Sequence, residues 1–267
     1  MHRIIVGVAS ATLFFCTFAL AGGQDQNGDK DSSHPAFKVL NGSRANPNIT
    51  LTQLLDSYEK AVGGKEAIEK IRTASVYAER RAQTKPGPER FGTSIEYFNF
   101  KLPNEVLPIR SGSKDVPGYD GQTFWYNDPN KGIQRKPQVM NVFAAQEFDL
   151  FSLLRLRTAF PQMELVGSSK VEGRDVYAVD APLGSQGLYR RLFIDAETRL
   201  LISSIVIQLA AGQTLISELF YSDFREVSGV KFPFAVRAID HNSQSSLEIR
   251  VSHIECNIPL GDAISSQ

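Results

Sequence analysis

The pattern of apolar positions along the chain changes from a helical to a strand period near residue 74. Before that point, apolar residues recur at the three- and four-residue spacing of one helix face until Gly63-Gly64 interrupts them. Thr50 stands where an N-cap is expected, and glycine is the usual residue just past a helix end. The sequence therefore predicts a helix from Thr50 to the glycine pair and a short helix over residues 65–71.

After residue 74, apolar and polar residues alternate, which is the period of a β-strand. This alternation predicts strands at 75–82, 92–102, 105–111, 122–127, 163–171, 175–181, 188–195, 200–209, 215–225, 232–240 and 246–256. The connections are short and contain turn residues such as Asp120-Gly121 and Ser228-Gly229. Parallel neighbours would need crossovers of about a dozen residues. We therefore expect an antiparallel meander.

Two parts of the chain are more apolar than a simple sheet requires. Residues 142–160 contain no Gly or Pro and are apolar around most of a helix circumference, which predicts a helix buried on most sides, across the sheet or at its mouth. Strands 200–209 and 215–225 are apolar on both faces, whereas a sheet with one wet face alternates cleanly. Either the sheet curls around helices or a cavity, or its core is thick and ordinary; periodicity leaves both open.

The N-terminal residues have the layout of a secretory signal peptide. A short positive start precedes an uncharged apolar run over residues 4–20, and Ala19-Leu20-Ala21 supplies the cleavage pattern. We expect residues 1–21 to be removed, residues 22–47 to form a disordered tether, 48–258 to form one domain and 259–267 a tail. The predicted location is the periplasm or the exterior. A membrane anchor and a lipidated Cys16 are the disfavoured alternatives.

Composition and motifs narrow the function. Lys+Arg and Asp+Glu are both 29, and no basic stripe stands out, so nucleic-acid binding is excluded. No motif for a nucleophile, phosphate loop, zinc protease or haem is present, so we predict no enzyme activity, cofactor or metal. His253 and Glu255 share a strand face, where an ordinary surface pair is favoured over metal ligands. Arg190 and Arg191 point to opposite faces of one strand; one could meet an anionic headgroup, but solvated side chains are the usual outcome.

Four segments resemble motifs of a known family. Residues 119–129 (YDGQTFWYNDP), 193–200 (FIDAETRL), 221–233 (YSDFREVSGVKFP) and 58–67 (YEKAVGGKEA) are similar, in matching order, to segments of the LolA/LolB-like superfamily of periplasmic lipoprotein carriers. Arg199 stands where a glycine is common in that family. The resemblance implies an α+β fold: an antiparallel sheet curled into an incomplete, unclosed β-barrel, with helices on its concave side enclosing an apolar cavity for acyl chains.

The resemblance and the aromatic clusters together suggest a binding site for something apolar. Aromatic residues on neighbouring strands are most often core, but they also suit a lipid pocket. The residues expected to line the cavity are Phe98, Phe100, Trp125, Phe148, Phe151, Leu154, Ile205 and Phe220. The expected partner is a lipid or an acylated protein, bound by a monomer that is peripheral rather than integral to the membrane. The alternatives are an envelope interaction or sensor module with a self-filled cavity and, less favoured, an unrecognised hydrolase.

Overall fold

The computed structural model describes residues 48–83, 87–99, 105–107, 118–120, 124–128, 132–135, 152–182, 188–210 and 213–259 of the 267-residue chain. Its helices are α3 (Leu51–Ala61), α4 (Lys65–Lys70), the 3₁₀ turn η1 (Ser152–Arg155) and α6 (Leu156–Ala159). Its strands are β1 (Thr73–Gln83), β2 (Arg90–Asn99), β3 (Glu105–Leu107), β4 (Gly118–Asp120), β5 (Phe124–Asp128), β6 (Gly132–Arg135), β7 (Glu164–Val171), β8 (Arg174–Pro182), β9 (Leu188–Asp195), β10 (Leu201–Ala210), β11 (Gln213–Val227), β12 (Val230–Asp240) and β13 (Ser245–Cys256).

All described strands belong to one antiparallel sheet in the order β6-β5-β4-β3-β2-β1-β13-β12-β11-β10-β9-β8-β7. Strands that follow one another along the chain are paired, except β6 and β7, and the pairing of β1 with β13 joins the two halves. The sheet formed by the described strands does not close, because β6 and β7 are its two edges. The antiparallel meander and the unclosed sheet predicted from the sequence are confirmed. The short strands β4 and β6 were not predicted.

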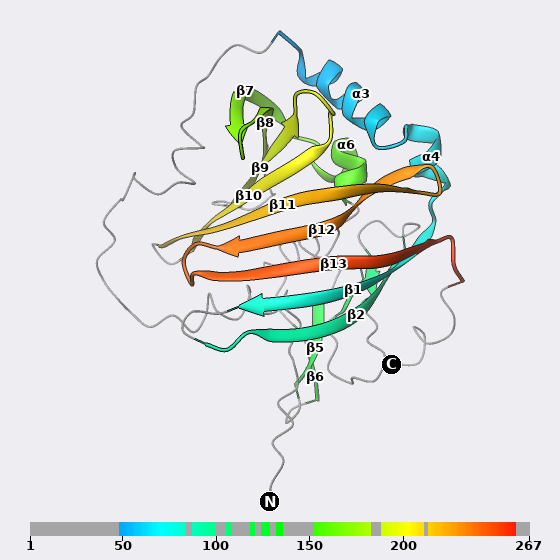
Figure 1. Ribbon diagram of the computed structural model, residues 1–267, viewed down its shortest axis with the longest axis vertical. Coiled ribbons are helices and arrows are strands. Elements are labelled where there is room, and N and C mark those ends of the chain that lie inside the picture. The colour runs from blue at the N-terminus through cyan, green and yellow to red at the C-terminus, as the bar shows by residue number, and fades with distance from the viewer. Residues whose placement is uncertain are drawn as a thin grey trace, which may run out of the picture.

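The sheet is strongly curled at its β7–β8 end. Glu172 lies between β7 and β8, and its Oε1 is 2.5 Å from Nη2 of Arg237 on β12. In a flat sheet, four strand spacings of about 4.8 Å would separate β8 from β12 by roughly 19 Å, more than the two side chains can span. The end of the sheet must therefore roll over. In Figure 1, β7 to β9 stand at a steep angle to β11–β13.

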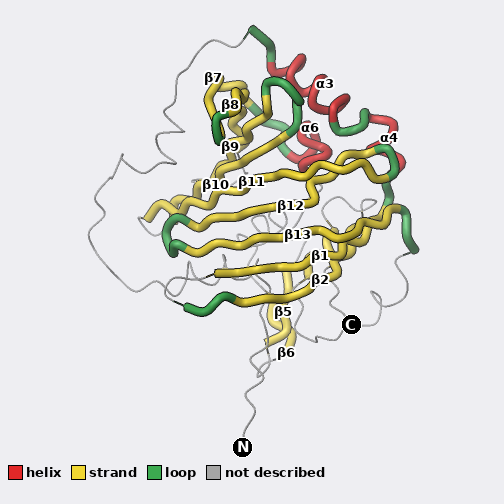
Figure 2. The backbone as a smooth tube through the Cα atoms, viewed as in Figure 1, coloured by secondary structure: helices red, strands yellow, loops and turns green. Residues whose placement is uncertain are grey.

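The helices lie together on one side of this curled sheet, near the end where β11 turns into β12, as Figure 2 shows. Thr50 caps α3 in a capping box, accepting a hydrogen bond from the Gln53 backbone while the Gln53 side chain accepts one from the Thr50 backbone. After α3 the chain turns at Gly63, whose φ of 132° disfavours any other residue. A Cβ there would lie 2.2 Å from the carbonyl oxygen of Gly229. The glycine pair thus lets the helices dock against the β11–β12 turn, where Lys231 N donates to Val62 O at 2.8 Å.

The turn between β9 and β10 is organised by a buried carboxylate. Asp195 Oδ1 accepts hydrogen bonds from the backbone and hydroxyl of Thr198 and from the backbone of Glu197, and Arg174 Nε lies 2.9 Å from Oδ2. Burial alone would raise the pKa of Asp195, but these donors and the arginine charge together lower it below its ordinary value. Arg199 adopts a left-handed φ of 61°, which explains why a glycine is common at this position of the motif.

The prediction of one continuous helix over residues 142–160 is wrong for the part that the structure describes, 152–160. Here a 3₁₀ turn is followed by a single α-helical turn, and Arg155, the last residue of η1 and the N-cap of α6, has the non-helical angles φ −124° and ψ 46°. Leu153, Leu154 and Leu156 are all buried in the main core. The break lets consecutive leucines face the sheet, which one stripe of a regular helix does not allow. Residues 142–151 lie outside the described part.

Candidate ligand-binding interior

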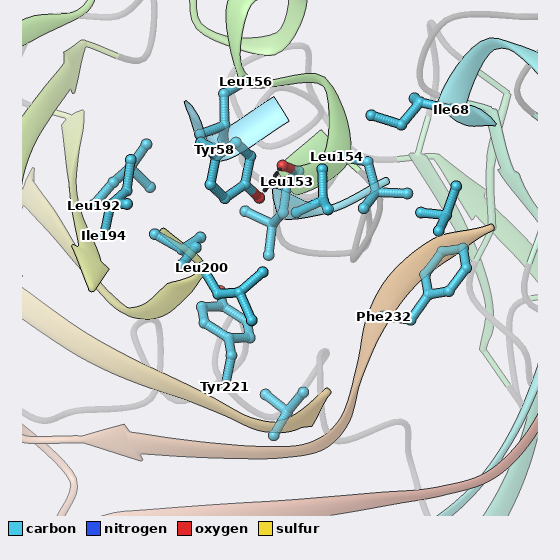
Figure 3. Packing of buried hydrophobic residues seen from close by; sticks show 14 of the residues in the cluster. Tyr58, Ile68, Leu153, Leu154, Leu156, Leu192, Ile194, Leu200, Tyr221 and Phe232 are labelled. Atoms are coloured by element: carbon cyan, nitrogen blue, oxygen red, sulfur yellow. Dashed lines mark hydrogen bonds between the residues drawn. The ribbon is translucent and has the colours of Figure 1, made fainter. Parts of the chain in front are cut away.

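The space between the sheet and the helices is filled from both layers by apolar side chains. We call this set the inner cluster, and Figure 3 shows its centre. The helical layer contributes Leu54, Leu55, Tyr58, Val62, Ile68, Leu153, Leu154 and Leu156, and Phe160 follows α6. The sheet contributes, among others, Val179, Leu192, Ile194, Leu201, Val206, Tyr221, Phe232 and Val251. The inner cluster therefore runs across most of the strands from β8 to β1.

Two phenols lie inside the inner cluster. Tyr58 on α3 is 4% exposed, and its hydroxyl donates to the carbonyl oxygen of Leu153, which ties α3 to η1 (Figure 3). Burial, with a smaller contribution from Tyr221, raises the pKa of Tyr58 far above its ordinary value. Tyr221 on β11 shares a hydrogen bond of 3.2 Å with the Ser204 hydroxyl on β10. At neutral pH the Tyr58 phenol is therefore neutral, and it acts as a donor rather than a base.

Arg190 brings a positive charge to the same side of the sheet. It alternates along β9 with Leu192 and Ile194, which belong to the inner cluster, and it is only 2% exposed. Its guanidinium carbon lies 5.9 Å from the ring centroid of Phe160. Its Nε is buried and has no hydrogen-bond acceptor among the residues that the structure describes. The expectation of a solvated side chain is therefore wrong for Arg190.

Arg191 points to the other side and is paired. Its Nε and Nη2 lie 2.6 and 2.7 Å from the two carboxylate oxygens of Asp180 on β8, a bidentate geometry. Its side chain is 12% exposed. A second apolar cluster occupies this side. This outer cluster consists of Val171, Val176, Ala178, Phe193, Ile202, Ile205, Ile207 and Ile216, with Val166 and Phe220 packed against it.

The predicted cavity residues fall into three groups. Leu154 is in the inner cluster and 7% exposed. Ile205 is fully buried in the outer cluster, and Phe220 packs against that cluster. The structure therefore does not bring these three into one site. For Phe98 and Trp125 only the backbones of β2 and β5 are described, and Phe100, Phe148 and Phe151 lie outside the described residues. Their role in ligand binding stays a prediction.

Sequence reasoning missed the buried polar groups of the interior, although a signal was available. Arg190 occupies a position in the i, i+2, i+4 series with Leu192 and Ile194, so a charged residue stands in an apolar row. Tyr58 and Tyr221 stand in apolar rows too, and their hydroxyls must find partners when the rings are buried. A charged or hydroxyl-bearing residue within a row of apolar residues is thus the sequence pattern that predicts the buried polar groups of this interior.

The remaining candidate groups for chemistry are dispersed. His253 Nε2 lies 3.4 Å from Glu255 Oε1 on an exposed part of β13, as expected of a surface pair. Among the residues described, no group of three or more His, Cys, Asp or Glu could hold a metal ion. Burial raises the pKa of the half-buried Cys256 thiol, and a hydrogen bond with Ser228 offsets only part of that effect. None of the helices in the described ranges is long and apolar enough to cross a membrane.

Comparison with known proteins identifies the fold. No sequence-family model and no curated protein matches the chain by sequence. Among solved structures, a LolA superfamily protein from Nitrosomonas europaea is 13% identical with a TM-score of 0.58, covering 82% of this chain and 98% of that one. A structure from Vibrio parahaemolyticus that bears the name of an outer membrane lipoprotein-sorting protein domain is 13% identical with a TM-score of 0.57. The match covers 78% of this chain and 94% of that one.

A DUF1329 family protein from Desulfovibrio piger is 14% identical with a TM-score of 0.55, covering 79% of this chain and 95% of that one. Each likeness extends over nearly the whole of the other chain at very low identity. Together they show that this chain has the LolA-like fold, as the four sequence motifs indicated.

Proposed function

We propose that the chain is an exported, non-catalytic binding protein that holds an apolar ligand, a lipid or the acyl chain of a lipoprotein, between the sheet and its helices. The observation that carries this proposal is the inner cluster, an apolar interior shared by the sheet and the helices of a LolA-like fold. The name of the Vibrio parahaemolyticus domain, with lipoprotein sorting in it, points the same way. Transfer of an acyl chain into such an interior is favourable by roughly 25 cal/mol per Å² of buried apolar surface.

The interior offers little for catalysis. General acid–base chemistry needs a group whose pKa lies near the working pH. The Tyr58 pKa is shifted away from that range, and an arginine keeps its proton at any physiological pH. These groups suit a binding role, in which hydroxyls and a fixed charge orient a ligand.

We further propose the processing expected from the sequence: removal of residues 1–21, a tether over 22–47, one binding domain over 48–258, and a monomer at the membrane periphery. The Ala19-Leu20-Ala21 pattern before a polar stretch supports this. N-terminal sequencing of the exported protein should begin at Gly22. A first residue of Met1 in exported material would contradict the cleavage.

The binding proposal is tested by comparing a residue of each cluster. Leu154→Ala in the inner cluster should weaken binding of the neutral fluorescent probe N-phenylnaphthylamine several-fold, because ligand contacts are removed. Ile205→Ala in the outer cluster is the matched control. It should lower the free energy of unfolding by about 2–5 kcal/mol and leave probe affinity unchanged. A wild-type protein that takes up no probe would favour the alternative, an interaction module with a self-filled interior.

A further inference from the structure

We propose that Arg190 is the anchor for an oxyanion, the carboxylate or phosphate head of an amphiphile whose chain lies over the inner cluster. This inference rests on the proposed binding function and names the chemical class of its ligand. The binding site would then have a polar end, at Arg190, that recognises the head of the ligand. A protein that carries only neutral apolar chains would have no use for a buried cation.

Burial of the Arg190 side chain is energetically costly. A guanidinium cannot lose its proton in a protein, so a buried arginine remains charged. Buried charges are normally paired, because an uncompensated charge in an apolar setting is strongly unfavourable. Arg190 is 2% exposed, and no carboxylate pairs with it among the described residues. Its contact with the Phe160 ring, at 5.9 Å, is near the limit of a cation–π interaction.

The strand register places no counter-charge opposite Arg190 on either neighbouring strand. Its cross-strand partners are Ala181 on β8 and Val206 on β10, both in the inner cluster. The next residue, Arg191, stands opposite Asp180 in the same register and pairs with both of its oxygens. Of the two consecutive arginines, Arg191 has a carboxylate placed for it, whereas Arg190 has none among the residues that the structure describes.

The geometry also favours an oxyanion over other partners. The planar donor fork of arginine matches carboxylate and phosphate groups in a bidentate manner. Ser204 on β10 stands two residues from Val206 on the same face, and its hydroxyl is bonded to Tyr221. An anion at Arg190 would thus lie in the row of β9 side chains that continues with Leu192 and Ile194 into the inner cluster.

The test compares amphiphiles that share one chain and differ in the head. Binding of oleate, oleyl phosphate and oleyl alcohol to the protein purified from its own host, after delipidation, is measured by isothermal titration calorimetry. The wild type should bind at least one of the two anions roughly 10- to 100-fold more tightly than the alcohol, as expected for a charge-assisted hydrogen bond. The anion that binds more tightly identifies the head as a carboxylate or a phosphate.

Variants then locate the effect. Arg190→Met should abolish the preference for the anion and leave affinity for oleyl alcohol unchanged, whereas the matched control Arg191→Met should retain the preference. If the wild type binds the alcohol and both anions equally tightly, the anion site is overturned and the proposed function stays intact. Failure of all three ligands to bind would instead contradict the proposed function. A preference that survives Arg190→Met would also overturn the assignment.

Discussion

The two faces of the sheet at β9 are both apolar, but they satisfy their buried polar groups differently. On the outer side, Arg191 is paired with Asp180 within the sheet, and Arg237 on β12 reaches Glu172 at the curled end. On the inner side, Arg190 is buried against Phe160 without a carboxylate among the described residues. Within the described residues, the arginines of the outer side have carboxylate partners, as expected of a structural core. Within the same residues, the Arg190 charge of the inner side has none, which is typical of a site that another molecule completes.

The largest effect on stability is expected where the helical cover of the inner side meets the sheet. Gly63→Ala places a methyl group 2.2 Å from the Gly229 carbonyl oxygen at a φ of 132°. It should lower the free energy of unfolding by about 3 kcal/mol or more, measured by urea denaturation. Gly64→Ala is the control, since it has a φ of 85° but nothing within 4 Å, and it should cost only about 1–2 kcal/mol. Equal losses would mean that this docking contact is not needed.

The next largest changes in stability are expected at the two consecutive arginines, where substitution should destabilise the fold in one case and not in the other. Arg191→Met leaves the part-buried Asp180 unpaired and should destabilise the fold by about 1–3 kcal/mol. Arg190→Met removes a buried charge that has no carboxylate partner among the described residues, and it should leave stability unchanged or raise it by about 1 kcal/mol. Thermal melts of the ligand-free variants measure both. A marked loss of stability in Arg190→Met would show that its charge is already compensated within the protein, which contradicts the contrast between the faces.

Asp195, at the end of the strand that both faces share, links stability to pH. Because its pKa is lowered on folding, its ionised form contributes stability that is complete above the unfolded pKa of about 3.9 and is lost as pH falls through the folded pKa. Asp195→Asn should therefore cost about 1–2 kcal/mol at pH 7. The difference from wild type should shrink below about pH 4. Urea denaturation at several pH values tests this, and a difference that is constant down to pH 3 would contradict it.

The smallest effect is expected at Arg199. Its left-handed φ of 61° favours glycine, but its guanidinium also lies 5.1 Å from the Tyr177 ring centroid. Relief of backbone strain and loss of this contact offset each other, so Arg199→Gly should change stability by no more than about 1 kcal/mol. A thermal melt in which the variant loses much more would show that the ring contact, rather than the turn, determines the residue.

The recognised motifs were informative about the fold because they form turns and a docking contact. The 193–200 motif supplies Asp195 and the Thr198 donors of the β9–β10 turn. The 58–67 and 221–233 motifs meet where Gly63 packs on Gly229. Short-range backbone requirements of this kind can be read from sequence, since a turn or a positive φ restricts the residue that can occupy it. Both the Asp195 turn and the Gly63–Gly229 contact belong to the backbone framework, so the motifs predicted an architecture and not the residues of a site.

The candidate site could be predicted only in part, for two physical reasons. Apolar residues on both faces of β10 correctly indicated two apolar environments, but periodicity does not say which face meets the helices. Leu154 and Ile205, predicted for one cavity, therefore lie in different clusters. The break at Arg155 was also missed, because packing of consecutive leucines overrode local helix propensity. Both the assignment of these residues to clusters and the helix break depend on packing between distant parts of the chain, which cannot be read from the periodicity of one sequence.

Whether the interior holds an apolar ligand is tested most directly by native mass spectrometry of the protein isolated from its own envelope. We expect a complex heavier than the processed polypeptide by the mass of an acyl-chain compound, recovered by lipid extraction of the same sample. A native mass equal to that of the polypeptide alone, with no lipid in the extract, would contradict it.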